Sequence, residues 1–591
     1  MSVILGIDLG TTNSVVSILR DGQPVVIGDE QGRRVLPSVV GFDSDGNLLV
    51  GETARNQALL APQRTVKSIK RHMGEATRVK LGEQEFTPQE ISAMILRTLK
   101  QWAERELNEP VTKAVITVPA FFNENQREAT RMAGELAGLE VVRIVNEPTA
   151  AVLTYEPHST RNEKLLVYDL GGGTFDVSIV QTEMDVVEVL ASRGDTHLGG
   201  DDFDQLLLDH VCNAFETEHG IDLRQIPTAR SRLLQSVEAA KIRLSSEPFA
   251  TVAEEFIADK NGAPLNLNIE IDRSDYEAMI ASLLAKTIEC VDVALSDAKL
   301  SAVQLDRVIL VGGSSRTPLV RRLLIEQLGH EPLVSVDPDL CVSMGAAVQG
   351  GLISGDQVRQ VLVDITPRTL GIACLEGPPE ISGKLIFSPI IHRNSPLPAS
   401  RSEVYCTARR GQAAARIDVY QGEHEDIRFN QEIGSFNLEN LDTQAHEGSE
   451  ILVRFDMNHD GILNVTAIER ATGNERRLTI NNALSRFDSS DRGQAKSRLS
   501  EIFDDNALGE LVVAADETLE TNSAASTPLL AEAGSLLDKA RELLKEAAAE
   551  DAEEMRMLIE QLEHAALVGD RESVDDVRHK LEDILFYLED A

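Results

Sequence analysis

Two segments with the same pattern carry the residues best suited to chemistry. When GIDLGTTNSVVSI (6–18) is placed over VYDLGGGTFDVSI (167–179), Asp8 matches Asp169 and Gly10 matches Gly171. In each copy an apolar run ends in an aspartate, turns through glycine and threonine, and continues as a second apolar run. We therefore predict a duplicated element in which a buried strand, a tight turn and a second strand follow one another.

Such a turn is suited to binding phosphate. Glycine lets backbone N–H groups point at an anion without a Cβ in the way, and the hydroxyls of Thr11, Thr12 and Thr174 add donors. Two turns that face each other would hold one polyphosphate. Asp8 and Asp169 would hold hydrated Mg²⁺ beside it, because carboxylates repel phosphate. Either turn alone is more often an ordinary glycine-rich hairpin, whereas the matched pair favours a phosphate site.

Two further segments suit the rest of a nucleotide. VGGSSRTP (311–318) follows an apolar strand and enters a helix, which suits backbone packing against a base or ribose. Glu238, Lys241 and Ser245 fall at steps of three and four on one helical face, which is otherwise read as a solvated polar face.

Lys70 and Glu147 are candidates for the reaction itself. Lys70 lies in VKSIKRHMG, where a surface lysine is the simpler interpretation, yet phosphoryl transfer needs a cation opposite the γ-phosphate. Glu147 follows a strand in RIVNEPTAAV, a position from which a carboxylate would orient water.

The elements that position these residues change along the chain. Up to about 355, apolar runs such as KAVITVPA and DRVILVGG alternate with helical segments such as QEISAMILRTLKQWAERELN, which predicts an α/β region with ligand groups at the strand ends. From about 365 to 483, short alternating runs joined by turns such as NHDG predict a separate β domain. After about 484 the apolar spacing predicts a small helical bundle.

Composition excludes several classes of protein. A chain of 591 residues is too long for one small domain. Its 57 basic and 96 acidic residues give a formal net charge of -39, which disfavours nucleic acid and anionic membranes as partners. The five scattered cysteines and the absence of a long apolar run lead us to expect a cytoplasmic protein without structural zinc.

Seven motifs in this order resemble the DnaK-like seventy-kilodalton heat-shock chaperones. They are GIDLGTTNS, VPAFFNENQREAT, RIVNEPTAA, YDLGGGTFDVS, GDTHLGGDDFD, VGGSSRTP and GAAVQGG. The resemblance implies a multidomain chain: an actin-like α/β ATPase of two lobes at 1–355, a linker at 356–364, an antiparallel β-sandwich that binds peptide at 365–483, and an α-helical lid at 484–591.

The same resemblance implies a nucleotide site with ATP or ADP, Mg²⁺ and nearby K⁺. The phosphate-binding residues would be Gly10, Thr11, Thr12, Asn13, Gly171, Gly172, Gly173 and Thr174. The catalytic residues would be Lys70, Glu147, Asp169, Thr174 and Asp8, and the residues that hold Mg²⁺ mainly through water would be Asp8, Asp169 and Asp176. The adenosine site would comprise Glu238, Lys241, Ser245, Gly312, Gly313, Ser314, Arg316 and Asp339, with Ile242 where some members have a stacking arginine.

It also implies an allosteric route and a peptide groove. Pro119 and Arg127 match a proline switch and a relay arginine, and the positions near the linker groove where J-domain proteins dock are Arg143, Asn146 and Asp364. The linker carries three apolar residues, Val361, Leu362 and Val363, in place of the usual four. The groove residues would be Ile372, Leu375, Ala408, Gln412, Ala415 and Ile417.

The function implied is an ATP-dependent chaperone that binds and releases extended apolar segments of unfolded proteins. Its partners would be a J-domain cochaperone and a GrpE-like exchange factor that faces residues 246–274. The alternatives are a sugar-kinase-type phosphotransferase on the same core, an actin-class filament former, and a specialised paralogue with few clients. The β domain would have no role in a sugar kinase.

Overall fold

The computed structural model describes residues 3–155, 162–183, 186–333, 337–356, 361–377, 383–409, 411–443, 449–458, 461–480 and 493–503, together with Leu558. The chain divides into two compact units, Met1–Phe503 and Asp504–Ala591. Most of the expected helical lid lies outside the described residues. No helix in these described segments is long and apolar enough to cross a membrane.

The first unit begins with a sheet built on the first predicted turn. Its strands run in the order β11 (Glu140–Asn146), β10 (Lys113–Val118), β1 (Ile4–Leu9), β2 (Asn13–Arg20) and β3 (Gln23–Ile27), and β4 (Leu36–Pro37) pairs with β2. Strands β11, β10 and β1 are parallel, whereas β1 and β2 form an antiparallel hairpin. We call residues 3–155 the first lobe.

Two of the predicted helices cover this sheet. They are α2 (Pro88–Leu107) and α3 (Glu124–Leu136), and both begin with a capping box, from Thr87 to Glu90 and from Asn123 to Gln126. Smaller elements of the lobe are α1 (Glu52–Gln57), β5 (Val39–Phe42), β6 (Leu48–Val50), β7 (Thr65–Lys67), β8 (Val79–Leu81), β9 (Gln84–Phe86) and two 3₁₀ turns, η1 (Pro62–Arg64) and η2 (Ile69–His72).

The second sheet confirms the predicted duplication. Its order is β17 (Arg307–Val311), β12 (Glu163–Leu170), β13 (Phe175–Glu183), β14 (Val186–Asp195) and β18 (Val361–Val363). β12 and β13 form an antiparallel hairpin like that of β1 and β2, so Asp8 and Asp169 each lie one residue before the end of a first strand. We call residues 162–333 the second lobe.

Helices and a hairpin complete the second lobe. The helices are α5 (Gly200–His219), α6 (Pro227–Leu244), α7 (Arg273–Asp297) and α8 (Pro318–Leu328), the hairpin is β15 (Phe249–Lys260) with β16 (Ala263–Asp272), and the short turns are η3 (Leu223–Gln225), η4 (Ala302–Gln304) and η5 (Gly313–Arg316). Their buried apolar side chains pack with those of the second sheet into one core cluster.

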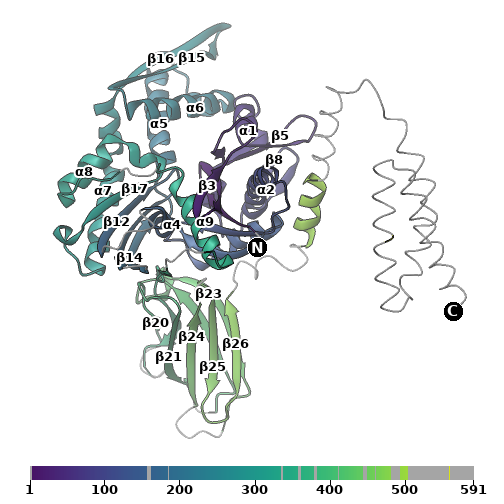
Figure 1. Cartoon of the computed structure of the whole chain (residues 1–591), viewed down its shortest axis with the longest axis vertical. Coiled ribbons are helices and arrows are strands. Elements are labelled where there is room, and N and C mark those ends of the chain that lie inside the picture. Colours follow the sequence, from purple (N-terminus) through teal and green to yellow (C-terminus); the bar gives the residue numbers. More distant parts are fainter. Residues whose placement is uncertain are drawn as a thin grey trace, which may run out of the picture. The chain divides into compact units, whose positions relative to one another are not determined.

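Two helices lie between the sheets (Figure 1): α4 (Glu147–Thr154) and α9 (Cys341–Ser354). The GAAVQGG motif explains how closely they pack. A Cβ on Gly345 would stand 1.8 Å from the Ala150 carbonyl oxygen, so α9 approaches α4 at a distance that only glycine permits.

The predicted β domain is a two-sheet sandwich. One sheet has the order β20 (Leu385–Ile391), β19 (Leu370–Leu375), β22 (Ala414–Gln421) and β23 (Gln431–Glu439), and the other β21 (Ala399–Cys406), β24 (Glu450–Met457), β25 (Leu463–Glu469) and β26 (Glu475–Ile480). The NHDG turn joins β24 to its antiparallel partner β25, which confirms the predicted hairpin. A short 3₁₀ turn, η6 (Ile427–Phe429), precedes β23.

A helix at 493–503 packs on the first lobe. Ala495 and Leu499 are buried in the same core cluster as α2. Arg498 forms an ion pair with the fully buried Glu90, and its guanidinium lies 5.2 Å from the ring centroid of Phe86. This part of the expected lid is therefore packed with the first lobe in the described structure.

Glu124, at the first turn of α3, should make stability depend on pH. Burial raises its pKa to about 7, because the charged form loses water that nearby Arg127 does not replace. Below the pKa of about 4.5 that Glu124 has in the unfolded chain, the carboxyl is neutral in both states and does not affect stability. As pH rises through 7, the free energy of unfolding falls by up to about 3 kcal/mol, because the folded protein must then bury a charged carboxylate. We expect the melting temperature of Glu124→Gln to be several degrees above that of wild type at pH 8 and equal to it at pH 4.5.

Differential scanning fluorimetry of the nucleotide-free protein at the two pH values measures this effect. The control is Glu83→Gln, since Glu83 is exposed in the same lobe. An equal stabilisation of Glu124→Gln at both pH values would show that ionisation of the buried carboxyl is not the cause.

Candidate functional site

The two turns line a common cavity of about 300 Å³, which we call the central cavity. Residues predicted for phosphates, chemistry and adenosine all contribute to its wall: Asp8, Gly10, Thr11, Thr12, Asn13, Lys70, Glu147, Asp169, Gly171, Gly172, Thr174, Glu238, Lys241, Ser245, Gly312, Gly313, Ser314, Arg316 and Asp339. Gly173 and Asp176 lie just behind this wall. The structure thus brings together residues that are more than 300 positions apart in the sequence.

The turns touch one another directly. A Cβ on Gly172 would stand 1.8 Å from Thr12 Oγ1, so the close approach of the two turns requires glycine at this position. Gly173 packs in the same way against Thr11. Thr12 Oγ1 is buried and has no hydrogen-bond partner in the described part of the chain, which leaves a hydroxyl free for a ligand oxygen.

An acidic cluster forms the floor of the cavity. Asp8 and Asp169 end β1 and β12, Asp176 lies on β13, and Glu147 begins α4. Burial, together with repulsion from Glu147, raises the pKa of Asp8 to about 7 and raises the pKa values of Asp169 and Asp176 well above the ordinary range. Among the described residues, no three acidic, His or Cys side chains are placed to hold a metal directly, so these carboxyls would attract a cation through bound water.

Lys70 is the cation that the chain itself supplies there. It lies on η2, is buried, and forms an ion pair with Glu147. Its ammonium lowers the pKa of Asp8, Asp169 and Asp176, in opposition to burial. The simpler interpretation of Lys70 as a surface lysine is therefore wrong.

Two hydrogen bonds fix the carboxyls in place. Thr117 Oγ1, on β10, donates to Asp8 Oδ1 at 3.1 Å. The Phe121 backbone N–H donates to Asp176 Oδ1 at 3.0 Å and so ties the second lobe to the loop after β10.

The far end of the cavity suits a nucleoside. Lys241 Nζ lies 2.8 Å from Asp204, and Arg316 Nη2 lies 2.7 Å from Asp337 and 2.9 Å from Asp339. Both cations are thereby oriented along the cavity wall. Ile242 is 61% exposed and also lines the cavity, so it offers an apolar surface there.

Sequence reasoning missed the contacts that join the lobes across the cavity. Ser68 Oγ donates to Asp201 Oδ2 at 2.6 Å, and Arg71 pairs with Asp202. Arg55 Nη2 lies 3.1 Å from Glu238 Oε2. The acid pair in GGDDFD and the basic residues beside Lys70 were visible in the sequence, but nothing local indicated that they would face each other.

The predicted allosteric residues form a chain of hydrogen bonds. Arg127 donates to the Ala120 carbonyl at 3.1 Å and to Asn146 Oδ1 at 2.6 Å, and Asn146 Nδ2 donates to Asp364 Oδ2 at 2.8 Å. The buried Pro119 immediately precedes Ala120. Arg143 lies on β11, paired with β10.

The predicted groove residues are spread over one part of the sandwich. Ile372, Ala415 and Ile417 are buried in its core, Leu375 is half-buried at the end of β19, and Ala408 and Gln412 lie in the β21–β22 loop. Tyr405, which we did not predict, packs on the same core and shares a 2.9 Å hydrogen bond with Ser388.

A family model described as Hsp70 protein matches residues 4–81 and 75–589. The chain belongs to the Hsp70 family. Hsp70 proteins are ATP-dependent chaperones that bind ATP or ADP with Mg²⁺, unfolded clients and cochaperones. The match to this Hsp70 spans both turns and the β-sandwich.

Contact between the turns should be needed for nucleotide binding by this Hsp70. Gly172→Ala places a methyl group against Thr12 and forces the turns apart, so we expect the affinity for Mg·ATP to fall by roughly 100-fold through lost charge-assisted bonds to phosphate. Titration with a fluorescent ATP analogue measures it. Gly383→Ala is the control, because a Cβ there meets nothing within 4 Å. An affinity within threefold of wild type would contradict the clamp.

Proposed function

We propose that this protein hydrolyses ATP to ADP and phosphate in the central cavity and uses the cycle to bind and release extended apolar segments of unfolded proteins. The observation that carries the proposal is the pair of glycine turns that meet at Thr12 and Gly172 over a floor of buried carboxyls. Donors on two opposed turns suit a polyphosphate, and the acid floor suits its metal.

The roles of the side chains follow from their positions. The Lys70 ammonium would stabilise charge on the transferred phosphoryl group, and the Glu147 carboxylate would accept a hydrogen bond from the attacking water. Thr174, at the second turn, would donate to a phosphate oxygen.

The carboxyls of Asp8, Asp169 and Asp176 fit Mg²⁺, because a hard divalent cation prefers oxygen ligands and would relieve their mutual repulsion. When bound, mainly through water, Mg²⁺ would neutralise charge on the phosphate oxygens. We propose K⁺ as a second cation near the same acids.

The linker gives the site a way to act at a distance. Residues Val361–Val363 form β18, which pairs in parallel with β14 at the edge of the second sheet. Asp176 holds the loop at Phe121, Arg127 binds that loop and Asn146, and Asn146 binds Asp364 directly after the linker. A change in the position of Asp176 would be transmitted to the linker through these hydrogen bonds.

Contacts of the β domain with both lobes support coupling. Arg393 Nη2, between β20 and β21, lies 2.9 Å from Asp297 at the end of α7, and Asp297 also pairs with Arg193 on β14. Asn123 Nδ2 in the first lobe donates to Gln431 at 2.9 Å. ATP can favour this docked arrangement only by binding it more tightly than the undocked one.

We assign client binding to the groove residues of the sandwich and cochaperone binding to the ATPase. A J-domain protein would dock near Arg143, Asn146 and Asp364, and a GrpE-like exchange factor would face residues 246–274, which contain the β15–β16 hairpin. The short linker and Ala415, which replaces a usual valine, are compatible with a specialised paralogue. We propose the cytoplasm as its location.

Removing catalytic groups should stop hydrolysis and leave client binding intact. We expect Lys70→Ala and Thr174→Ala to lower steady-state ATP turnover by roughly 10²–10³-fold, because each removes stabilisation of charge in the transition state. Without nucleotide, both should bind a fluorescent unfolded peptide as wild type does. Normal ATP turnover in both variants would show that the central cavity is not the site of hydrolysis. A sugar kinase would instead release little inorganic phosphate, because it transfers the phosphoryl group to a sugar hydroxyl.

Disrupting the linker should uncouple the two activities. Leu362 is half-buried on β18 against the core between the sheets, so Leu362→Asp should expel the strand from the edge. We expect basal hydrolysis within about threefold of wild type and loss of its stimulation by unfolded peptide. Val303→Asp is the control, since Val303 is 87% exposed in the second lobe. If unfolded peptide still stimulates hydrolysis in Leu362→Asp, coupling does not depend on the pairing of β14 with β18.

A further inference from the structure

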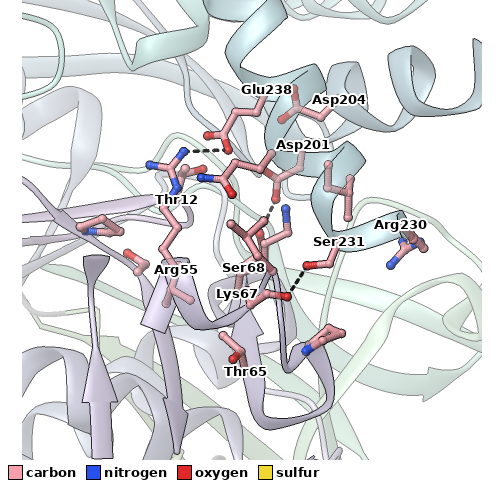
Figure 2. Close-up of a pocket in the computed structure, with 18 of the residues that line it drawn as sticks. Thr12, Arg55, Thr65, Lys67, Ser68, Asp201, Asp204, Arg230, Ser231 and Glu238 are labelled. Carbon is pink, nitrogen blue, oxygen red and sulfur yellow. Dashed lines mark hydrogen bonds and ion pairs between the residues drawn. The ribbon is translucent and has the colours of Figure 1, made fainter. Parts of the chain in front are cut away.

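A second cavity shares part of its lining with the central cavity. Figure 2 shows this second cavity. It has a volume of about 390 Å³, and we call it the side cavity. Elements of the first lobe around α1, β5 and β7 form one wall, and α6 of the second lobe forms the other. Both cavities are lined by Thr11, Thr12 and Asn13, so the side cavity opens where the terminal phosphate of a bound nucleotide would lie.

The side cavity carries an excess of unpaired positive charge. Each of its acids already has a cationic partner: Asp201 lies 4.0 Å from Arg71 Nε, Asp204 pairs with Lys241, and Glu238 pairs with Arg55. Lys67 and Arg230 also line it, are exposed, and form no ion pair with any residue in the described part of the chain. Two free cations at the opening of a cavity attract an anion.

The apolar part of the wall strengthens that attraction. Val39, Leu59 and Leu234 line the side cavity between its charged groups. They offer no hydrogen bond to an anion and lower the local polarity, so the field of Lys67 and Arg230 is screened less than on an open surface. Lys67 and Arg230 would attract an anion, whereas the apolar side chains of the walls would not hold it.

A strained residue stands where the two cavities meet. Ser68 has φ +56°, a left-handed conformation unusual for a residue with a side chain, and its hydroxyl crosses to Asp201 in the second lobe. Figure 2 shows Ser68 and Asp201 joined across the pocket. Ser68 lies between Lys67, which lines the side cavity, and the turn that carries Lys70, so one short segment serves both cavities.

We propose that the side cavity is the route by which inorganic phosphate leaves after hydrolysis, with Lys67 and Arg230 binding the anion on its way out. The proposal rests on the proposed hydrolysis of ATP in the central cavity. ADP left behind would occupy the part of the central cavity lined by Lys241, Gly312 and Arg316. Phosphate would therefore move away from ADP, past Thr12 and Ser68. The Ser68 contact with Asp201 is the gate that this movement must pass.

Phosphate that occupies the side cavity, whose walls come from both lobes, should hold the lobes together and slow the release of ADP. We would measure the dissociation of a fluorescent ADP analogue from the full chain against increasing inorganic phosphate. In Lys67→Gln/Arg230→Gln, we expect the phosphate concentration for half of the slowing to rise by at least about tenfold, because two charge-assisted contacts are lost. The control is Lys80→Gln, an exposed lysine on β8.

The outcomes separate this proposal from the proposed function. If the analogue does not bind at all, the nucleotide site itself is wrong. If it binds and its release responds to phosphate equally in wild type and the double variant, or in neither, the side cavity does not hold phosphate and the proposal is overturned.

A blocked cavity provides the second test. Leu234→Trp should fill the space beside α6 while leaving the central cavity unchanged. In a single turnover, we expect ATP cleavage, measured after acid quenching, to proceed at the wild-type rate, and free phosphate, measured with a fluorescent phosphate sensor, to appear after a lag absent from wild type. Cleavage and release that coincide in the folded variant would show that phosphate leaves by another route.

Discussion

The buried ammonium of Lys70 is the interaction on which the rest of the site depends. The carboxyls of Glu147, Asp169 and Asp176 are buried beside the half-buried Asp8, and burying so much like charge is strongly unfavourable. The ion pair of Lys70 with Glu147 offsets part of this cost, yet burial, with a smaller contribution from repulsion by Glu147, still raises the pKa values of Asp8 and Asp176. A bound metal would reduce both effects.

The segments beside Lys70 and Asp176 also join the two lobes. Lys70 reaches the acids because η2 follows the left-handed Ser68, and Ser68 is held by Asp201 of the second lobe. On the other side, Asp176 holds the loop from which Arg127 and Asn146 lead to the linker. When β18 leaves β14, that strand becomes an exposed edge with unpaired backbone groups, so docked and undocked linkers are two discrete states rather than a continuum.

Elements that depend on residues close together in the sequence could be predicted from the sequence alone. The duplicated turns, the α2 and α3 helices and the β24–β25 hairpin follow from apolar periodicity and turn residues within a few positions. The contacts between lobes could not be found in this way, because Arg55 and Glu238 meet only after two separate sheets have closed on one another. The helix at 493–503 illustrates the same limit: its apolar positions show that it packs, but not that Glu90 and Phe86 are its partners.

The arrangement of contacts around the side cavity implies an order for product release. Arg55 and Glu238, with the Ser231 hydroxyl donating to the Ala58 carbonyl at 2.6 Å, join the lobes along α6 and lie beside both cavities. Bound as proposed, ADP would contact residues of both lobes, so its release would require these bonds to break. Phosphate that leaves by the proposed route past Ser68 would not require this. Loss of phosphate would therefore precede opening of the lobes, and the ADP-bound protein would persist until a partner separates them.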